Sequence, residues 1–167
     1  MGRGDKIAAD KAAVDAMRLV MNTIQMDGVI VIGEGEKDEA PMLFNGEHLG
    51  TGEAPQVDIA VDPIDGTRPM ALGLPNAISV VALAPRGTMF NPGPIMYMEK
   101  IAVGPGARNV IDINAPVEDN LSKIARALGK DLNDLTAVIL DRERHKELIG
   151  RVRKTGARIL LIPDGDV

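Results

Sequence analysis

The last third of the chain constrains the fold most, because strand and helix patterns alternate there. Residues 136–140 form a short aliphatic run, and residues 157–162 form a second one. Between them, residues 143–155 have the pattern of a charged amphipathic helix with Leu148 and Val152 as its inner stripe. This succession predicts a βαβ unit, whose two strands are nearly always parallel. We therefore predict an α/β or layered α+β fold, with a mixed sheet flanked by helices and the βαβ unit at its end.

The rest of the chain carries further regular segments separated by turns rich in glycine and proline. Helical spacing of apolar residues predicts helices at residues 8–26 and 117–128. Short β-branched or alternating runs predict strands at residues 28–33, 57–61, 77–84 and 96–103. We expect one domain-like chain over residues 1–167, with a metal and phosphate subregion at about 1–115 and the start of a βαβ subregion at about 116–167.

Composition excludes several classes of function. Of the 167 residues, 45% are hydrophobic and 26% are charged, which is typical of a folded globular protein. The formal net charge is −5 and the only aromatic residues are Phe44, Phe90 and Tyr97, so nucleic acid is not an expected partner. The chain has no cysteine, no apolar run long enough to span a membrane and no signal-peptide pattern, so we expect a cytoplasmic protein without a membrane partner.

The run from Asp62 to Thr67, Asp-Pro-Ile-Asp-Gly-Thr, has the composition of a divalent-metal and phosphate site. Asp62 and Asp65 are three residues apart across a proline, so a bend after the strand can aim both carboxylates at one point. Gly66 allows a phosphate to approach the backbone, and Thr67 offers a hydroxyl that can orient a water molecule. These residues predict Mg²⁺- or Mn²⁺-dependent hydrolysis of a phosphate ester.

Two more acidic residues could complete this site. Glu34 follows the strand predicted at residues 28–33, and Asp10 lies near the start of the first predicted helix. Each has a simpler interpretation, since residues 34–39 could be a solvated acidic loop, Asp10 a surface residue and the Asp-Pro and Asp-Gly pairs an ordinary turn. The basic residues Arg142, Arg144 and His145 could grip phosphate or form surface ion pairs.

The motifs together resemble the bacterial class II fructose-1,6-bisphosphatases of the lithium-sensitive sugar phosphatase superfamily. The Asp62–Thr67 run alone resembles the superfamily. The narrower resemblance rests on Gly-Arg-Gly-Asp-Lys at 2–6, Ile-Gly-Glu-Gly-Glu at 32–36, Asp-Glu-Ala-Pro-Met at 38–42, Tyr-Met-Glu-Lys at 97–100, Val-Gly-Pro-Gly at 103–106 and Asp-Gly-Asp at 164–166.

The resemblance implies a role for each matching residue. It implies that Asp10, Glu34, Asp62 and Asp65 bind the metal and that Thr67 helps to activate the attacking water, with Asp62 and Asp65 as further catalytic residues. The substrate contacts that it implies are Asp65, Gly66, Thr67, Tyr97, Arg142, Glu143, Arg144, Asp164, Gly165 and Asp166.

The resemblance also implies an activity and a larger protein. The expected reaction removes the 1-phosphate of fructose 1,6-bisphosphate in gluconeogenesis. The alternatives are a bifunctional fructose-1,6- and sedoheptulose-1,7-bisphosphatase, or a metal- or phosphate-binding fragment without turnover. Family members form homo-oligomers and continue past the Asp-Gly-Asp motif to a further acidic ligand, so we expect the chain to be an N-terminal portion that associates with copies of itself.

Overall fold

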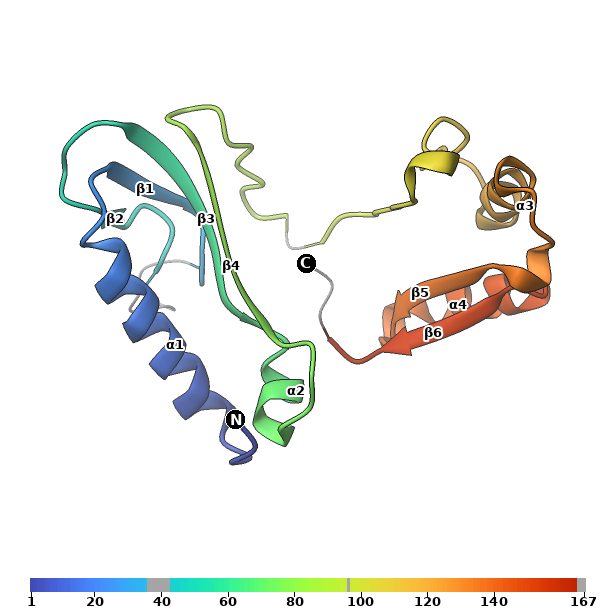
Figure 1. Cartoon of the computed structure of the whole chain (residues 1–167), viewed down its shortest axis with the longest axis horizontal. Helices are drawn as coiled ribbons and strands as arrows, with labels where there is room; N and C mark the ends of the chain where they lie inside the picture. Colours follow the sequence, from blue (N-terminus) through green and yellow to red (C-terminus); the bar gives the residue numbers. More distant parts are fainter. Residues whose placement is uncertain (36–42, 96, 165–167) are drawn as a thin grey trace. The chain divides into compact units, whose positions relative to one another are not determined.

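The computed structural model describes residues 1–35, 43–95 and 97–164 (Figure 1). It divides the chain into two compact units. The first contains Met1–Ile95 and the residues from Asp164 onward, and the second contains Met96–Pro163. The boundary between the units, after Ile95, lies earlier in the sequence than the subregion boundary predicted near residue 115. The predicted subregions concern function and stay a prediction.

The first unit is built on a mixed four-stranded sheet. Its strands are β1 (Asp27–Ile32), β2 (His48–Leu49), β3 (Gln56–Asp65) and β4 (Ile78–Pro85), in the order β2-β1-β3-β4. β1 and β3 are parallel, whereas β2 and β4 pair antiparallel to their neighbours. Consequently, the carboxyl ends of β1 and β3 lie at the same edge of the sheet.

Helix α1 (Lys6–Met21) and the short helix α2 (Thr67–Leu72) complete this unit. Val14 and Met21 of α1 are buried in one hydrophobic cluster with Ile30 of β1 and Ile59 of β3. Burial of these aliphatic side chains against the sheet therefore holds α1 in place.

The sequence pattern predicts that the first helix continues to residue 26, but α1 ends at Met21. Beyond Met21 the chain turns, because the Ile24 and Met26 carbonyls accept hydrogen bonds from the Thr51 and Gly52 N–H groups at 3.0 Å each. Met26 itself is buried in the sheet cluster. Long-range backbone pairing therefore overrides the local helical pattern here.

The second unit contains the βαβ arrangement. Helix α3 (Val117–Leu128) precedes strand β5 (Thr136–Leu140), helix α4 (Lys146–Lys154) and strand β6 (Arg158–Ile162), with 3-10 turns at Pro105–Ala107, Leu132–Asp134 and Glu143–His145. β5 and β6 pair in parallel, with Thr136 opposite Arg158. The mixed sheet flanked by helices and the closing βαβ unit are thereby confirmed.

A separate hydrophobic cluster stabilises this unit. Leu121, Ala125, Leu135, Val152 and Ala157 are buried together. The α3 and α4 helices are also joined by a two-pronged ion pair, in which Arg151 Nε and Nη2 lie 2.8 and 2.6 Å from the Glu118 carboxylate oxygens. This hydrogen bonding lowers the pKa of Glu118 to about 2.

Two sequence predictions for this unit are wrong. Residues 97–103 form no strand, and Tyr97 and Met98 remain exposed. A strand needs a partner edge, and the chain passes instead into the Gly104 and Pro105 turn. Within α4, Ile149 and Val152 are buried, whereas Leu148 is 36% exposed. Both Leu148 and Ile149 lie within one turn of Val152, so spacing alone allows either, and packing against α3 decides between them.

In the part of the chain that the structure describes, no helix is both long enough and apolar enough to cross a bilayer.

The contrast between the neighbours Ile149 and Leu148 gives a test of α4 packing. We expect Ile149→Ala to lower the free energy of unfolding by about 2–4 kcal/mol, because it leaves a cavity in a buried site. Leu148→Ala removes the same number of carbon atoms from a more exposed site and should cost clearly less. Urea unfolding followed by circular dichroism measures both, and equal losses would contradict the burial assigned to α4.

Candidate metal and phosphate site

The Asp62–Thr67 run forms the end of β3 and the turn into α2. The strand extends beyond the predicted residues 57–61 to Asp65, and its pairing with β4 shifts register between Asp62 and Asp65. Pro63 is buried, and its carbonyl accepts a hydrogen bond of 2.8 Å from the Ser79 hydroxyl. A register irregularity of this kind bends a strand and re-aims its side chains, so both acids are placed by β3 itself.

Gly66 makes the turn between β3 and α2 possible. Its φ of 88° lies in the left-handed region, and a Cβ there would be 3.4 Å from the Ala77 Cα. Asp65 before it is buried, and Thr67 after it is the half-buried first residue of α2. The three predicted substrate contacts in this run therefore sit on consecutive residues of one tight turn.

Asp10 lies on α1, which the N-terminal segment fastens beside α2. The Gly2 and Gly4 N–H groups donate to the Met70 and Ala71 carbonyls of α2 at 2.9 and 3.0 Å. The Asp5 carboxylate then accepts from the Ala8 N–H at 2.9 Å and so caps α1. These contacts give the Gly-Arg-Gly-Asp-Lys motif a structural role, which the sequence alone did not indicate.

Glu34 lies just beyond the carboxyl end of β1, in a backbone held on both sides. Its N–H donates to the Leu43 carbonyl at 2.9 Å, and the Gly33 N–H donates to Asn45 Oδ1 at 2.8 Å. A Cβ at Gly33 would lie 2.2 Å from the Leu43 carbonyl oxygen, so only glycine allows this approach. The rest of the predicted acidic loop, residues 36–39, lies outside the described residues.

Electrostatics brings three of the four predicted metal ligands together. The pKa of Glu34 is raised above its ordinary value by desolvation of its carboxyl group and then by the negative charges of Asp10 and Asp62. Glu34 counts as exposed by surface area, but its carboxyl group lies among enough protein atoms to lose part of its hydration. Acids from α1, β1 and β3 therefore share one neighbourhood.

The donor set fits a hard divalent cation. Carboxylates from three separate elements repel one another, and a cation between them would relieve that repulsion with the oxygen ligands that Mg²⁺ and Mn²⁺ prefer. Among residues 1–35, 43–95 and 97–164, no three acidic or histidine side chains already stand at ligand distances from a common point. The assignment of Asp10, Glu34, Asp62 and Asp65 as ligands stays a prediction.

The second unit brings together two of the predicted substrate contacts. The Arg144 guanidinium carbon lies 4.2 Å from the centre of the Tyr97 ring, a cation–π contact. Arg144 belongs to the turn after β5, where the Arg142 N–H donates to the Leu140 carbonyl at 3.0 Å. His145 Nδ1 also lies 2.9 Å from that carbonyl, which gives the histidine a structural position in this turn.

For the remaining predicted substrate contacts, the structure gives positions along the chain but no arrangement that indicates a substrate. Glu143 forms an exposed ion pair with Lys146 at 2.7 Å. Asp164 is half-buried and follows β6 by two residues. Gly165 and Asp166 lie outside the described residues. Their substrate roles stay predictions.

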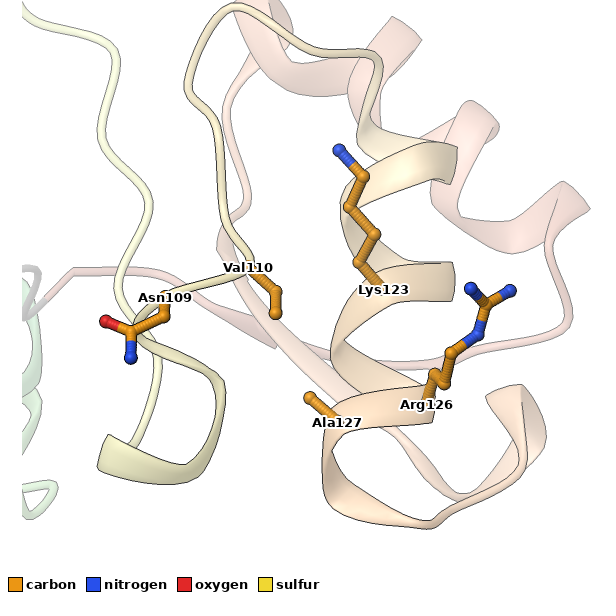
Figure 2. A pocket seen from close by; sticks show the side chains of 5 residues that line it. All are labelled: Asn109, Val110, Lys123, Arg126 and Ala127. Carbon is orange, nitrogen blue, oxygen red and sulfur yellow. The ribbon is translucent and has the colours of Figure 1, made fainter.

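A surface hollow of the described residues lies elsewhere. It has a volume of about 380 Å³ and is lined by Asn109 and Val110 together with Lys123, Arg126 and Ala127 of α3 (Figure 2). None of the predicted site residues lines it, and both basic side chains are exposed to solvent. Concavity alone therefore does not mark the candidate site in this chain.

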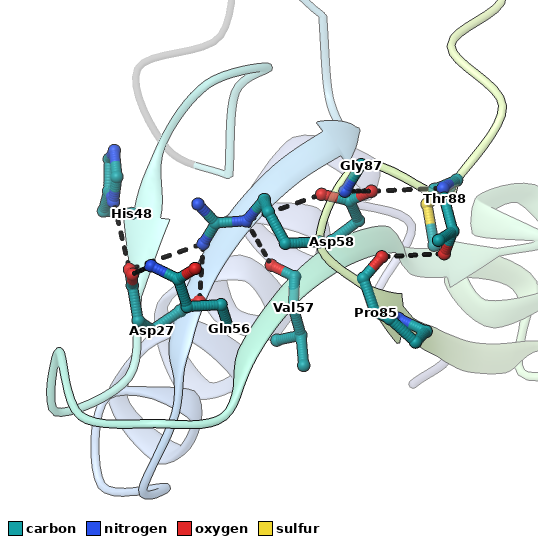
Figure 3. Close-up of polar contacts among 10 residues, drawn as sticks. Asp27, His48, Gln56, Val57, Asp58, Pro85, Gly87 and Thr88 are labelled. Carbon is teal, nitrogen blue, oxygen red and sulfur yellow. Dashed lines mark hydrogen bonds and ion pairs between the residues drawn. The ribbon is translucent and has the colours of Figure 1, made fainter.

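In a second charged cluster, at the opposite end of the sheet, the acidic side chains are paired with hydrogen-bond donors and an arginine (Figure 3). The buried Asp58 carboxylate accepts from the Gly87 and Met89 N–H groups at 2.7 and 3.1 Å. Arg86 Nη2 donates to the Asp27 carbonyl at 2.6 Å. A hydrogen bond from Gln56 and the charge of Arg86 lower the pKa of Asp27. These contacts join the starts of β1, β3 and the end of β4, which is a structural role.

Comparison with known proteins gives consistent matches. The family described as bacterial fructose-1,6-bisphosphatase, glpX-encoded, matches residues 1–167. Fructose-1,6-bisphosphatase 1 class 2 of Escherichia coli (strain K12) and fructose-1,6-bisphosphatase class 2 of Shigella flexneri are each 55% identical to the chain over 167 residues. The alignment covers 100% of this chain and 49% of each relative, so the chain spans about half the length of the curated relatives it matches.

The shared neighbourhood of the acids can be tested by titration. We expect Asp10→Asn and Asp62→Asn each to move the pKa of Glu34 back toward its ordinary value, since each removes one of the negative charges that raise it. NMR titration of the Glu34 carboxyl carbon measures this. Asp15→Asn is the matched control on α1, because Asp15 pairs with Lys11 at 2.8 Å and is absent from the causes of the Glu34 shift.

The same titration has a consequence for stability. The folded state binds the Glu34 proton more tightly than the unfolded chain does. The free energy of unfolding therefore loses this contribution as the pH rises from the ordinary pKa of a glutamate through the raised pKa of Glu34. Asp10→Asn should reduce that loss. An unchanged Glu34 titration in both variants would show that the three acids are not neighbours.

Proposed function

The chain belongs to the glpX-encoded bacterial fructose-1,6-bisphosphatases, and from this we propose that it acts in the metal-dependent removal of the 1-phosphate of fructose 1,6-bisphosphate. Water would supply the oxygen for a new P–O bond, and the bond between phosphorus and the sugar oxygen would break to give fructose 6-phosphate and phosphate. The observation that carries the proposal is the parallel pairing of β1 with β3, which brings Glu34 and Asp62 to one edge of the sheet. Desolvation and the charges of Asp10 and Asp62 raise the pKa of Glu34 there. Perturbed carboxylates gathered at strand ends are characteristic of functional sites.

In this proposal, Asp10, Glu34, Asp62 and Asp65 hold Mg²⁺ or Mn²⁺. A bound cation of this kind supplies positive charge against the phosphoryl oxygens and the leaving oxygen. The chain's own contribution is to fix the acids on α1, on β3 and just beyond β1, and these three elements pack in one unit. Positioning of this kind accounts for most of the protein's part in phosphoryl transfer.

Thr67 and Gly66 would handle the water and the phosphate. The Thr67 hydroxyl sits at the start of α2, where it can accept a hydrogen bond from the attacking water and orient its lone pair toward phosphorus. Gly66 has no side chain to keep a phosphoryl group from the backbone, and Asp65 would contact the same group.

Seven further residues would contact the sugar bisphosphate. We assign this role to Tyr97, Arg142, Glu143, Arg144, Asp164, Gly165 and Asp166. The contact of Arg144 with Tyr97 supports it, because the ring restricts a guanidinium group whose planar donors match a phosphate. The proposal extends to a homo-oligomer in the cytoplasm, in line with the resemblance to the family.

A metal- or phosphate-binding role without turnover is the second candidate, and the shared neighbourhood of Asp10, Glu34 and Asp62 supports binding whether or not hydrolysis follows. Both candidates predict metal binding, and only the first predicts release of phosphate. Calorimetry with Mn²⁺, paired with a phosphate-release assay on fructose 1,6-bisphosphate and sedoheptulose 1,7-bisphosphate, separates them and decides between the single and bifunctional enzymes.

Thr67 gives the sharpest test of the hydrolytic role. We expect the parent chain to release phosphate only with a divalent cation, and Thr67→Ala to be slower by a factor on the order of 10²–10⁴, since it loses the group that orients the water. Mn²⁺ binding should be retained. Thr51→Ala is the control, because Thr51 is exposed and lies outside the Asp62–Thr67 run. Turnover by Thr67→Ala at the parent rate would exclude this role.

Arg144 gives a test of substrate binding that needs no turnover. We expect Arg144→Met to weaken binding of fructose 1,6-bisphosphate by about 10-fold, the loss of one charge-assisted contact. Calorimetry measures the dissociation constant. The exposed Arg153 of α4 supplies the matched control Arg153→Met, which should bind within about twofold of the parent. If both variants bind equally well, Arg144 is not a substrate contact.

A further inference from the structure

Arg18 of α1 and Glu47 of the segment Leu43–Glu47 form an ion pair. Arg18 Nε lies 2.6 Å from Glu47 Oε1, and the Glu47 side chain is only 5% exposed. The two groups are close without being aligned as a hydrogen bond. We propose that these two residues are positioning residues, which set the place of Glu34 relative to Asp10. The metal-binding consequence of this proposal rests on the proposed function.

Glu47 organises the segment from Leu43 to Glu47. Its carboxylate accepts a hydrogen bond from the Leu43 N–H, in addition to facing Arg18. Its own N–H donates to the Phe44 carbonyl at 3.0 Å, and its carbonyl accepts from the Ile30 N–H of β1 at 2.9 Å. The segment is thus folded around one buried carboxylate and fixed to β1 by its backbone.

This segment in turn holds the backbone around Glu34. The Leu43 carbonyl accepts the Glu34 N–H, Asn45 Oδ1 accepts the Gly33 N–H, and the Asn45 N–H donates to the Gly35 carbonyl at 2.9 Å. Leu43 has a φ of 55°, a left-handed conformation that costs free energy for a branched residue unless its surroundings impose it. The hydrogen bond from Leu43 N–H to Glu47 is one of the contacts that impose it.

The other end of the ion pair is on the helix that carries Asp10. Arg18 lies on α1, so its attraction to Glu47 ties α1 directly to the segment that supports Glu34. Glu47 is buried whereas the Arg18 side chain is 44% exposed, and such an ion pair contributes little net stability, because desolvation of the carboxylate and screening of the guanidinium offset the attraction. What it does fix is the place of α1, which carries Asp10, relative to the 43–47 segment, which holds the backbone of Glu34.

Hydrogen exchange tests the positioning step without any metal. We expect Glu47→Gln and Arg18→Met to increase exchange at the Gly33 and Glu34 N–H groups by at least about tenfold, because the 43–47 segment loses its anchor. Arg86→Met is the matched control, since it removes an ion pair with Asp58 and Asp27 at the opposite end of the same sheet. It should leave those two N–H groups as protected as in the parent.

Mn²⁺ affinity, followed by electron paramagnetic resonance, tests the consequence for the site. We expect both variants to bind Mn²⁺ about 10-fold or more weakly, as is typical when residues that orient ligands are removed. Thermal melting checks that each variant is folded. Arg18→Lys keeps the positive charge and should therefore have an intermediate Mn²⁺ affinity. The double variant should lose no more than either single one, because the pair acts as a unit.

The outcomes separate the two proposals. Unchanged exchange at Gly33 and Glu34 in folded variants would overturn the positioning role. Equal losses of Mn²⁺ affinity in Arg86→Met would overturn it too, since a general loss of stability would then explain the effect. If the parent chain binds no Mn²⁺, the proposed metal site is wrong. Hydrogen exchange at the Gly33 and Glu34 N–H groups would then decide the positioning role on its own.

Discussion

The parallel pairing of β1 with β3 is the constraint on which the candidate site depends. Because the two strands run in the same direction, both end at one edge of the sheet, and the residues that follow them are brought close together. Glu34 follows β1, and Asp62 and Asp65 lie in the last part of β3. α1 then adds Asp10 by packing against this sheet. The electrostatic coupling of three acids that are far apart in the sequence is therefore a product of sheet topology.

Residues without chemistry of their own set the geometry of this edge. Gly33 allows the Leu43 carbonyl to approach, and Gly66 provides the left-handed turn before Thr67. At the N-terminus, the Gly2 and Gly4 N–H groups fasten the start of α1 to α2. A Cβ on Gly73 would lie 3.3 Å from the Gly2 Cα, so small residues on both sides permit that contact. The glycine-rich motifs thus act through the backbone, by fixing where the acids stand.

The sequence predicted best what depends on local pattern. The strand at 136–140 and the helix at 117–128 agree with β5 and α3, because the pattern of each lies within its own segment and Gly129 directly follows the helix. Prediction failed where distant residues decide. The end of α1 depends on Thr51 and Gly52, and within the strand expected at 96–103 the described residues 97–103 pair with no other strand. The sequence offered Asp10 both as a ligand and as a surface residue, and only the family resemblance favoured the ligand. Glu47 resembled any surface acid until its burial was known.

The two ends of the same sheet show why identical residue types differ in role. At the start of β1 and β3, hydrogen-bond donors and Arg86 surround Asp27 and lower its pKa, so its charge is satisfied within the fold. At the other end, burial and two neighbouring acids raise the pKa of Glu34, so the fold gathers negative charge there at a cost in stability. An arrangement that only stabilised the protein would favour the first pattern at both ends. The second pattern is better explained by a cationic ligand whose charge the acids are placed to share.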